Sequence, residues 1–258
     1  LRARRPLLRP RRVTVLPAGA AEHAQGCLVC GRDLVYAQAA SPATCATCGA
    51  TEPSPARCVE GHFVCDGCHS GSAMDVIERA CRRHEGRDPV ALATALMRHP
   101  AVKMHGPEHH FLVPAALLAT WATATGATGR DGLLAEARRR AGTVVGGSCG
   151  FHGACGSGVG VGIFASLATG TTPRSTGGWG RANRATGRAL QVIGEVGGPR
   201  CCKRTTWLAL LAGVRFVRQD LGVALEGQGP RCSFHGRNED CLARDCPFYP
   251  TTSGRGTN

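Results

Sequence analysis

The sequence predicts a mainly α-helical protein that carries a small cysteine-rich module at each end of its helical body. Cysteines with the spacing of metal ligands precede residue 73 and follow residue 227, whereas the residues between place apolar side chains at helical spacing. With 258 residues, 43% of them hydrophobic, the chain is long enough for one sizeable core and small satellite modules. The predicted parts are a basic disordered tail at 1–24, a zinc-binding module at 25–73, a helical body at 74–226 and a Cys-rich segment at 227–258.

The helical body is predicted from stretches in which apolar residues recur every three or four positions. Asp88 and Pro89 are residue types that favour the N-cap and the first position of a helix. No run of about 18 apolar residues occurs, so no transmembrane helix is predicted. We expect helices over 74–83, 89–98, 113–125, 132–141, 159–168, 183–196 and 205–221.

Cysteine usage and charge suggest the setting of the protein. The first twelve residues are basic but lack the hydrophobic region of a secretory signal, so the fifteen cysteines are expected as reduced, metal-bound thiols in the cytoplasm. The net charge of +13 favours an anionic partner such as nucleic acid. However, Lys103 and Lys203 are the only lysines among 31 basic residues, which indicates an arginine-rich coding bias rather than a dedicated binding surface.

The N-terminal module begins with two Cys-x-x-Cys pairs. Cys27 and Cys30 are separated from Cys45 and Cys48 by fourteen residues, a spacing typical of a zinc ribbon. The glycine, proline, serine and threonine residues around these pairs predict short turns and hairpins, in which metal replaces a hydrophobic core. The sequence therefore predicts a structural zinc site here.

A second set of ligands follows at once, in the order Cys58, His62, Cys65 and Cys68. This Cys-x3-His-x2-Cys-x2-Cys run resembles the central part of a RING or treble-clef finger and predicts a second zinc ion. Two pairings stay open: a sequential one that joins 27/30 with 45/48, and a cross-brace that joins 27/30 with 58/62. The C-terminal segment offers a third set of metal ligands, Cys232, His235, Cys241 and Cys246.

Three motifs in the body suggest chemistry. The first runs from Lys103 to His110, where Gly-Pro predicts a turn that leads into a helix with Glu108, His109 and His110 in its first turn. We interpret His105, Glu108 and His109 as candidate acid–base groups. The second motif has glycine at every other position from 156 to 162, beside two cysteines. Because glycine has no side chain, this face of the backbone can lie close either to a bound cofactor or to a neighbouring helix. Its candidate cofactor-binding residues are Cys149, Cys155, Gly156 and Gly158.

A third motif places Cys201 and Cys202 after Pro199, which is predicted to occupy the first position of the next helix. The positive end of that helix and the neighbouring Lys203 are expected to stabilise thiolates, so all three residues are predicted to be catalytic.

The motifs CLVCGRDLVY, CVEGHFVCDGCH, MHGPEHHFLVP, CGFHGACGSGVGVGI and GGPRCCKR together carry a family resemblance. Over residues 25–246 the chain resembles an uncharacterised Cys-rich domain family of archaea and anaerobic bacteria, sometimes associated with SAM-dependent methyltransferases. That resemblance implies a methyltransferase partner, because the chain itself has no recognisable methyltransferase fold.

The function predicted from these residues is that of an oxygen-sensitive metalloenzyme, acting as a transferase or an oxidoreductase. Cys149, Cys155, Cys201 and Cys202 would surround one site, either as ligands of an iron–sulfur cluster or as reactive thiols. Such a site suits sulfur transfer or redox chemistry on a small molecule. The alternative is a zinc-stabilised interaction module that binds nucleic acid or a methyltransferase partner. With 5% aromatic residues the chain has few side chains for base stacking.

Overall fold

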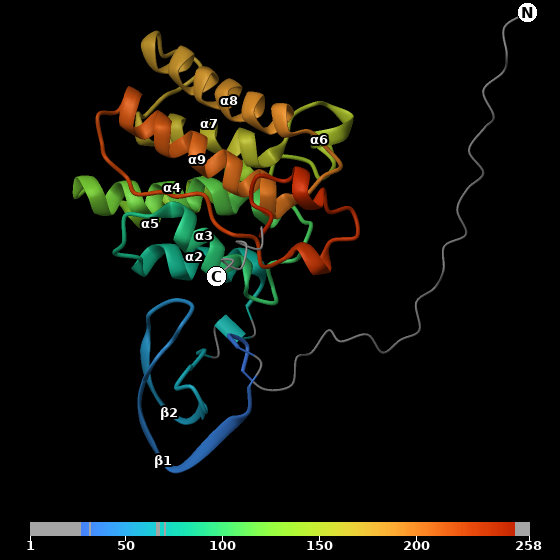
Figure 1. Ribbon diagram of the computed structural model, residues 1–258. Helices are drawn as coiled ribbons and strands as arrows, with labels where there is room; N and C mark the ends of the chain where they lie inside the picture. The colour runs from blue at the N-terminus through green and yellow to red at the C-terminus, as the bar shows by residue number, and fades with distance from the viewer. Residues whose placement is uncertain (1–26, 31, 66–67, 70, 251–258) are drawn as a thin grey trace, which may run out of the picture.

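The computed structural model describes residues 27–30, 32–65, 68–69 and 71–250, so the predicted basic tail lies outside the described residues. A β-hairpin comes first and projects from one end of a helical body (Figure 1). It consists of β1 (Leu34–Thr44) and β2 (Thr51–Cys58), which pair antiparallel. Their register shifts between Tyr36 and Ser41, where β1 carries extra residues that bulge out of the ladder.

The helical body contains the rest of the regular structure. Its helices are α2 (Ala73–Arg83), α3 (Pro89–Met97), α4 (Glu108–Thr125), α5 (Arg130–Ala141), α6 (Ser148–Phe151), α7 (Gly156–Ala168), α8 (Gly177–Val196) and α9 (Cys202–Asp220). Asp88 accepts hydrogen bonds from the N–H groups of Val90 and Ala91 and precedes Pro89, which confirms the predicted start of α3. None of the described helices combines the length and the apolar composition that crossing a lipid bilayer requires.

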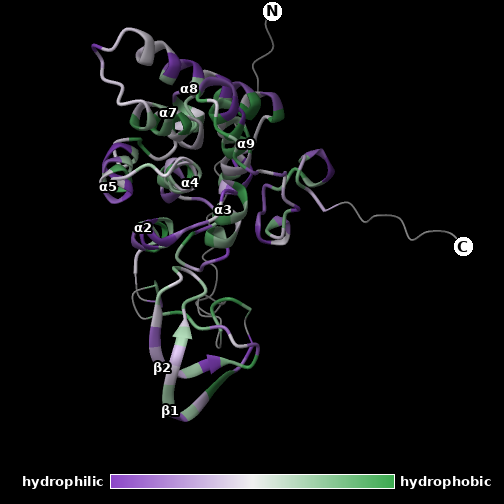
Figure 2. Ribbon diagram, turned by 90° about the vertical axis from the view of Figure 1, so that its left-hand side faces the viewer, coloured by the Kyte–Doolittle hydropathy of each residue, from purple (hydrophilic) through white to green (hydrophobic). Residues whose placement is uncertain are grey.

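Helix α4 forms the centre of the body. Every residue from Glu108 to Thr120 is buried, and α2, α3, α5, α7 and α9 all contact this helix. Figure 2 looks roughly along α4 and shows most of these helices around it. Because α4 is enclosed on all sides, it has no polar face, unlike α2 and α8, which turn charged side chains outward.

Close helix packing explains two of the alternate glycines of α7. A Cβ atom at Gly160 would lie 2.8 Å from Cδ of Pro114 and 3.1 Å from the carbonyl oxygen of His110, both in α4. A Cβ atom at Gly162 would meet the side chain of Thr186 in α8. These glycines therefore allow α7 to pack tightly between α4 and α8.

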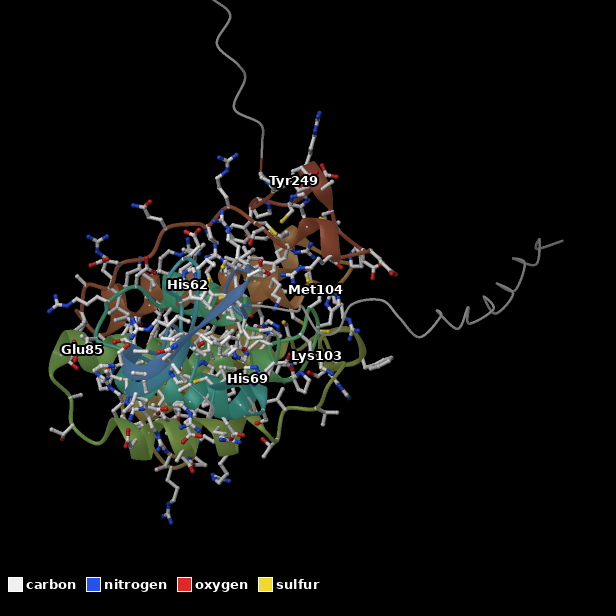
Figure 3. The ribbon with its side chains drawn as sticks, turned by 90° about the horizontal axis from the view of Figure 1, so that it is seen from below. His62, His69, Glu85, Lys103, Met104 and Tyr249 are labelled. Carbon is white, nitrogen blue, oxygen red and sulfur yellow. The ribbon has the colours of Figure 1, made fainter. Side chains whose placement is uncertain are left out.

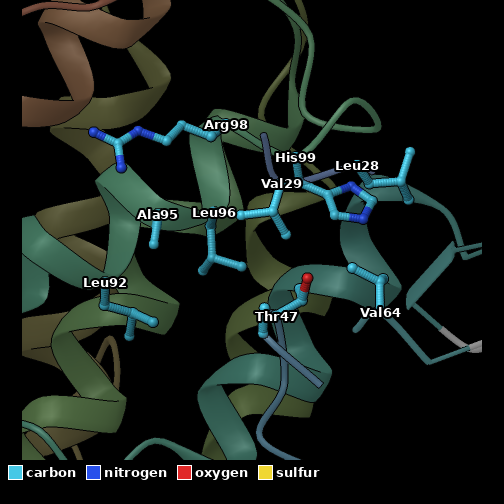
Figure 4. A pocket seen from close by; sticks show the side chains of 10 residues that line it. Leu28, Val29, Thr47, Val64, Leu92, Ala95, Leu96, Arg98 and His99 are labelled. Carbon is cyan, nitrogen blue, oxygen red and sulfur yellow. The ribbon is translucent and has the colours of Figure 1, made fainter. Parts of the chain in front are cut away.

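The hairpin module rests on the body through α3. Leu28, Val29 and Val64 of the module face Leu92 and Leu96 of α3 across a cavity of about 140 Å³ (Figure 4). Cys45, Cys48, Cys65 and Cys68 belong to the same continuous core as the helices. The module is thus packed against the body rather than tethered to it.

The C-terminal segment lies against the start of α9 (Figure 1). It is irregular apart from two short 3₁₀ turns, η1 (His235–Arg237) and η2 (Ala243–Asp245). Phe234 and Phe248 are buried and pack on Trp207 of α9 with ring centroids 5.9 and 5.2 Å away. These aromatic contacts hold the segment on the body.

Candidate functional site

Two groups of ligands in the N-terminal module can each hold a metal ion. In each group the four ligand atoms lie within 4.8 Å of one another. The outer cluster consists of Cys27, Cys30, Cys58 and His62, and the inner cluster consists of Cys45, Cys48, Cys65 and Cys68. The pairs alternate along the chain, which is the cross-brace order. The sequential pairing of a zinc ribbon, 27/30 with 45/48, does not describe this structure.

The hairpin produces this alternation. Leu34 pairs with Cys58, so the strand that leaves Cys30 returns to it through β2. The turn at the other end of the hairpin holds Cys45 and Cys48, and a parallel bridge from Cys45 to Phe63 brings the following pair alongside. The outer cluster therefore joins the two open ends of the hairpin, whereas the inner cluster joins its turn to the segment that follows β2.

The geometry of both clusters fits tetrahedral metal binding. The Sγ atoms of Cys48 and Cys65 lie 3.7 Å apart, and those of Cys30 and Cys58 lie 3.4 Å apart. Sulfurs bound to one zinc ion at about 2.3 Å are separated by about 3.8 Å. Nδ1 of His62 is buried and has no hydrogen-bond partner, so its lone pair is available to a cation.

The thiols of these clusters need a cation to ionise together. Burial alone would raise the pKa of Cys45, but N–H donors from Cys65, Cys48 and Thr47 lower it to about 7. For Cys68, burial and the neighbouring thiols raise the pKa. Because adjacent thiolates repel one another, a bound divalent ion is the natural way to deprotonate all members of a cluster.

A larger cavity, of about 470 Å³, lies in the helical body where α7, α8 and α9 meet. We refer to it as the thiol cavity. Its walls include four of the predicted cysteines together with one predicted glycine and a histidine: Cys149, Cys155, Cys201, Cys202, Gly156 and His110. Among the described residues these thiols do not form a group as compact as the two metal clusters.

Positive charge is concentrated at the thiol cavity. Cys155 is the N-cap of α7 and Cys201 the N-cap of α9, so the positive ends of two helices face the same space. Ser157 and Thr205 hydrogen-bond across these helix starts at 3.4 Å. Arg200 and Arg204 also line the cavity, and the buried Nε of Arg204 has no hydrogen-bond partner. The cavity is therefore suited to a small anionic molecule.

His110 is the one histidine of its motif that lines the thiol cavity. Its Nδ1 lies 3.1 Å from the carbonyl oxygen of Val144, so Nδ1–H donates and Nε2 is left as an acceptor in the neutral ring. The ring lies directly over Gly156, because a Cβ atom there would be 2.2 Å from its Cδ2. Burial lowers the pKa of His110, which keeps the ring neutral and able to accept a proton.

The three predicted acid–base residues lie elsewhere. His109 is fully buried, with its ring nitrogens 3.1 Å from the Thr206 hydroxyl and 3.1 Å from the Lys103 carbonyl oxygen. The Glu108 carboxylate accepts a hydrogen bond from the Lys103 N–H, and Nε2 of His105 lies 3.2 Å from Oδ1 of Asn238. These contacts hold the turn before α4, and none of the three residues lines the thiol cavity.

Lys203, predicted to lower the pKa of a thiol, has its ammonium group held by backbone carbonyl oxygens. Its Nζ donates to the carbonyl oxygens of Met97 and Val102 and lies 5.0 Å from the centre of the Phe234 ring. Helix α9 begins at Cys202, three residues after Pro199, so the proline does not occupy its first position. Burial raises the pKa of Cys201, and it raises that of Cys202 to about 11. Desolvation here outweighs the nearby cations.

Two further predictions change in detail. Gly158 does not line the thiol cavity; it makes room for Leu190 of α8, whose Cδ2 would be 2.6 Å from a Cβ atom there. His235 stacks edge-on against Tyr249 at 5.1 Å. It lines a small cavity together with the three C-terminal cysteines predicted to accompany it and with Cys201; those cysteines are Cys232, Cys241 and Cys246.

Comparison with known proteins identifies one similarity. A family of unknown function, DUF5714, matches residues 77–249, which leaves the hairpin module outside the matched region. No curated protein and no solved structure matches the chain.

Proposed function

The chain belongs to the DUF5714 family, and from its thiol cavity we propose that this protein is a zinc-containing enzyme that transfers sulfur between small anionic molecules. The observation that carries this proposal is the meeting of Cys155, His110 and two arginines in one cavity. A nucleophile, a neutral base and an anion site are the parts that sulfur transfer requires.

In this proposal the two N-terminal clusters hold zinc. Seven thiols and one imidazole are the soft and borderline ligands that zinc prefers, and each cluster supplies four of them. Four protein ligands leave no open position for a substrate. The zinc ions therefore have a structural role, holding the hairpin against α3.

Cys155 is the proposed nucleophile. It is half-buried at the N-terminus of α7, next to Gly156. The ring of His110 lies over that glycine. Nε2 of His110 accepts the thiol proton, and Cys155 attacks the outer sulfur of an anionic donor such as thiosulfate. The S–S bond of thiosulfate breaks, sulfite leaves with its electron pair and the proton, and Cys155 becomes a persulfide. Arg200 and Arg204 balance the charge of the donor and of the sulfite.

The second half of the reaction regenerates the enzyme. A nucleophilic acceptor such as cyanide attacks the outer sulfur of the persulfide, so the new S–S bond breaks, thiocyanate forms and the Cys155 thiolate returns. The thiolate then recovers a proton from water. The net reaction moves one sulfur atom from thiosulfate to cyanide, and it needs no external oxidant or reductant.

The test uses the purified full chain with thiosulfate and then cyanide. Mass spectrometry of the intact protein and of its peptides should find one added sulfur on Cys155 after thiosulfate, and thiocyanate should appear when cyanide follows. Cys155→Ser should lose both products, whereas Cys81→Ala, which alters a buried cysteine of α2 away from the cavity, should keep them. Absence of added sulfur on Cys155, or unchanged thiocyanate production by Cys155→Ser, contradicts the proposal.

A further inference from the structure

Cys201 lines both the thiol cavity and the small cavity formed by the C-terminal segment. The small cavity brings it together with Cys232, Cys241 and Cys246, so a cysteine at the start of α9 and three from the C-terminal segment converge. Two other residues of this wall, Met104 and Tyr249, are labelled in Figure 3. The set differs from the one expected from the sequence, because Cys201 joins it from α9.

We propose that Cys201, Cys232, Cys241 and Cys246 bind an iron–sulfur cluster of the [4Fe–4S] type. This centre stands independently of the sulfur transfer proposed at Cys155. It accounts for four cysteines that the proposed transfer reaction does not use.

The backbone around these thiols resembles that of the outer cluster. In that cluster the N–H groups of Val29 and Glu60 donate to the sulfurs of Cys27 and Cys58, each two residues earlier. The same two-residue pattern occurs in the C-terminal segment. There the N–H of Phe234 donates to Cys232 and that of Ala243 donates to Cys241, both at 3.3 Å. Cys201 likewise accepts from the N–H of Arg204 at 3.5 Å. Such donors stabilise metal-bound thiolates.

The backbone conformation of Ala243 is an independent indication that this segment forms a metal site. It has a φ of 48°, and among the described residues it is the only non-glycine residue with positive φ. A left-handed alanine is strained and persists where its surroundings fix it. The N–H of this residue donates to the sulfur of Cys241. The strain is therefore located where the proposed ligands converge.

The spacing of the sulfurs favours a polynuclear centre over a single zinc ion. In the outer and inner clusters the ligand atoms lie within 4.8 Å of one another, but the four sulfurs of the small cavity do not meet that limit. Thiolates on one zinc are packed in contact, whereas thiolates of a cubane bind different irons and stand farther apart.

The surroundings suit a negatively charged, water-excluding centre. Trp207 and the fully buried Phe234 line the cavity, and Arg204, which is 2% exposed, supplies a cation. Lys203 and Arg237 lie over the ring of Phe234 at 5.0 and 5.1 Å. Four thiolates give the cluster a net negative charge, which these cations offset. The shared wall at Cys201 would place the cluster beside the thiol cavity.

The test uses the full chain purified without oxygen and reconstituted with ferrous iron and sulfide. After desalting, iron, zinc and acid-labile sulfide are counted, and the visible and electron paramagnetic resonance spectra are recorded. We expect about four irons and four sulfides per chain, with a broad visible absorbance. A wild-type chain that takes up no iron, or that holds a third zinc in place of iron, overturns the proposal without any variant.

Variants then test the ligand set. Cys232→Ser and Cys246→Ser should lose most of the iron and the visible absorbance while keeping the zinc of the N-terminal clusters, which shows that they remain folded. His235→Gln should keep the cluster, because the ring of His235, which also lines the small cavity, packs edge-on against Tyr249. Cys81→Ala serves as a second control. Loss of iron in His235→Gln with retention in Cys246→Ser would overturn the assignment.

Discussion

The Sγ atoms of Cys48 and Cys65 lie 3.7 Å apart although 17 positions separate the two residues in the chain. This contact joins the turn of the hairpin to the segment that leads into α2, within the core of the molecule. It predicts that loss of metal from the inner cluster destabilises the helical body as well as the hairpin.

Cys48→Ser is expected to remove about one zinc ion per chain and to lower the thermal unfolding temperature. Cys30→Ser, in the outer cluster away from the helical core, should also remove one zinc but should lower that temperature less. Metal analysis paired with thermal unfolding followed by circular dichroism checks both. Equal destabilisation by the two variants would contradict the assigned position of the inner cluster.

Gly160→Ala is expected to destabilise the protein by about 1–3 kcal/mol, the usual cost of overpacking a close helix contact. The added methyl group would meet Pro114 and the His110 carbonyl oxygen, which cannot move aside independently of α4. The matched control is Gly187→Ala on exposed α8, where a Cβ atom meets nothing within 4 Å. It should be neutral or gain up to about 1 kcal/mol from helix propensity. Urea unfolding compares the two, and equal effects would refute this packing explanation.

His109 is expected to make folding stability sensitive to acid. Burial and the nearby Lys203 lower its pKa from 6.5 to about 3. As the pH falls, the unfolded chain therefore binds a proton at His109 near pH 6.5, whereas the folded chain binds it only near pH 3. The stabilisation is complete above pH 6.5 and is lost as the pH falls toward 3, by at most about 1.4 kcal/mol per pH unit. The stability of His109→Gln, measured by urea unfolding, should fall less steeply between pH 6.5 and 4. Parallel slopes would exclude His109 as the source.

Phe234→Ala is expected to release the C-terminal segment and to cost about 3–5 kcal/mol, as for other buried phenylalanines. Phe234 is fully buried against Trp207, whereas Phe151 is 88% exposed and provides the control substitution Phe151→Ala. Limited proteolysis should cleave Phe234→Ala within residues 222–250 first. An unchanged cleavage pattern would show that the aromatic contacts do not hold the segment.

Much of the helical body could be predicted from the sequence because its helices carry local signals. The Asp88–Pro89 start of α3 and the Gly-Pro turn before α4 were both confirmed. Helix α8 begins at Gly177, six residues before its predicted start, because its first turns are rich in glycine and show no apolar period. Pro199 gave a misleading start for α9, since its carbonyl oxygen and that of Gly197 accept hydrogen bonds from the Arg204 side chain and the helix begins only at Cys202.

The details of the sites depend on tertiary structure and could be predicted only in part. Identical Cys-x-x-Cys spacings allow either pairing, and it is the register of the hairpin that selects the cross-brace. Glu108, His109 and His110 are consecutive on a helix, so each points about 100° from the next and only packing decides which one meets a cavity. The position of Cys201 beside the C-terminal cysteines depends on how the last segment folds back onto α9.

The partnership of His110 with Cys155 is the central claim, and the alkylation rate of Cys155 tests it most directly. The full chain is treated with iodoacetamide at pH 7, and peptide mass spectrometry follows Cys155 together with the exposed Cys149, which serves as a reference in the same sample. His110→Gln should slow alkylation of Cys155 by about tenfold or more, as loss of a general base does, and leave Cys149 unchanged. Equal rates for Cys155 in the wild type and in His110→Gln would contradict the account.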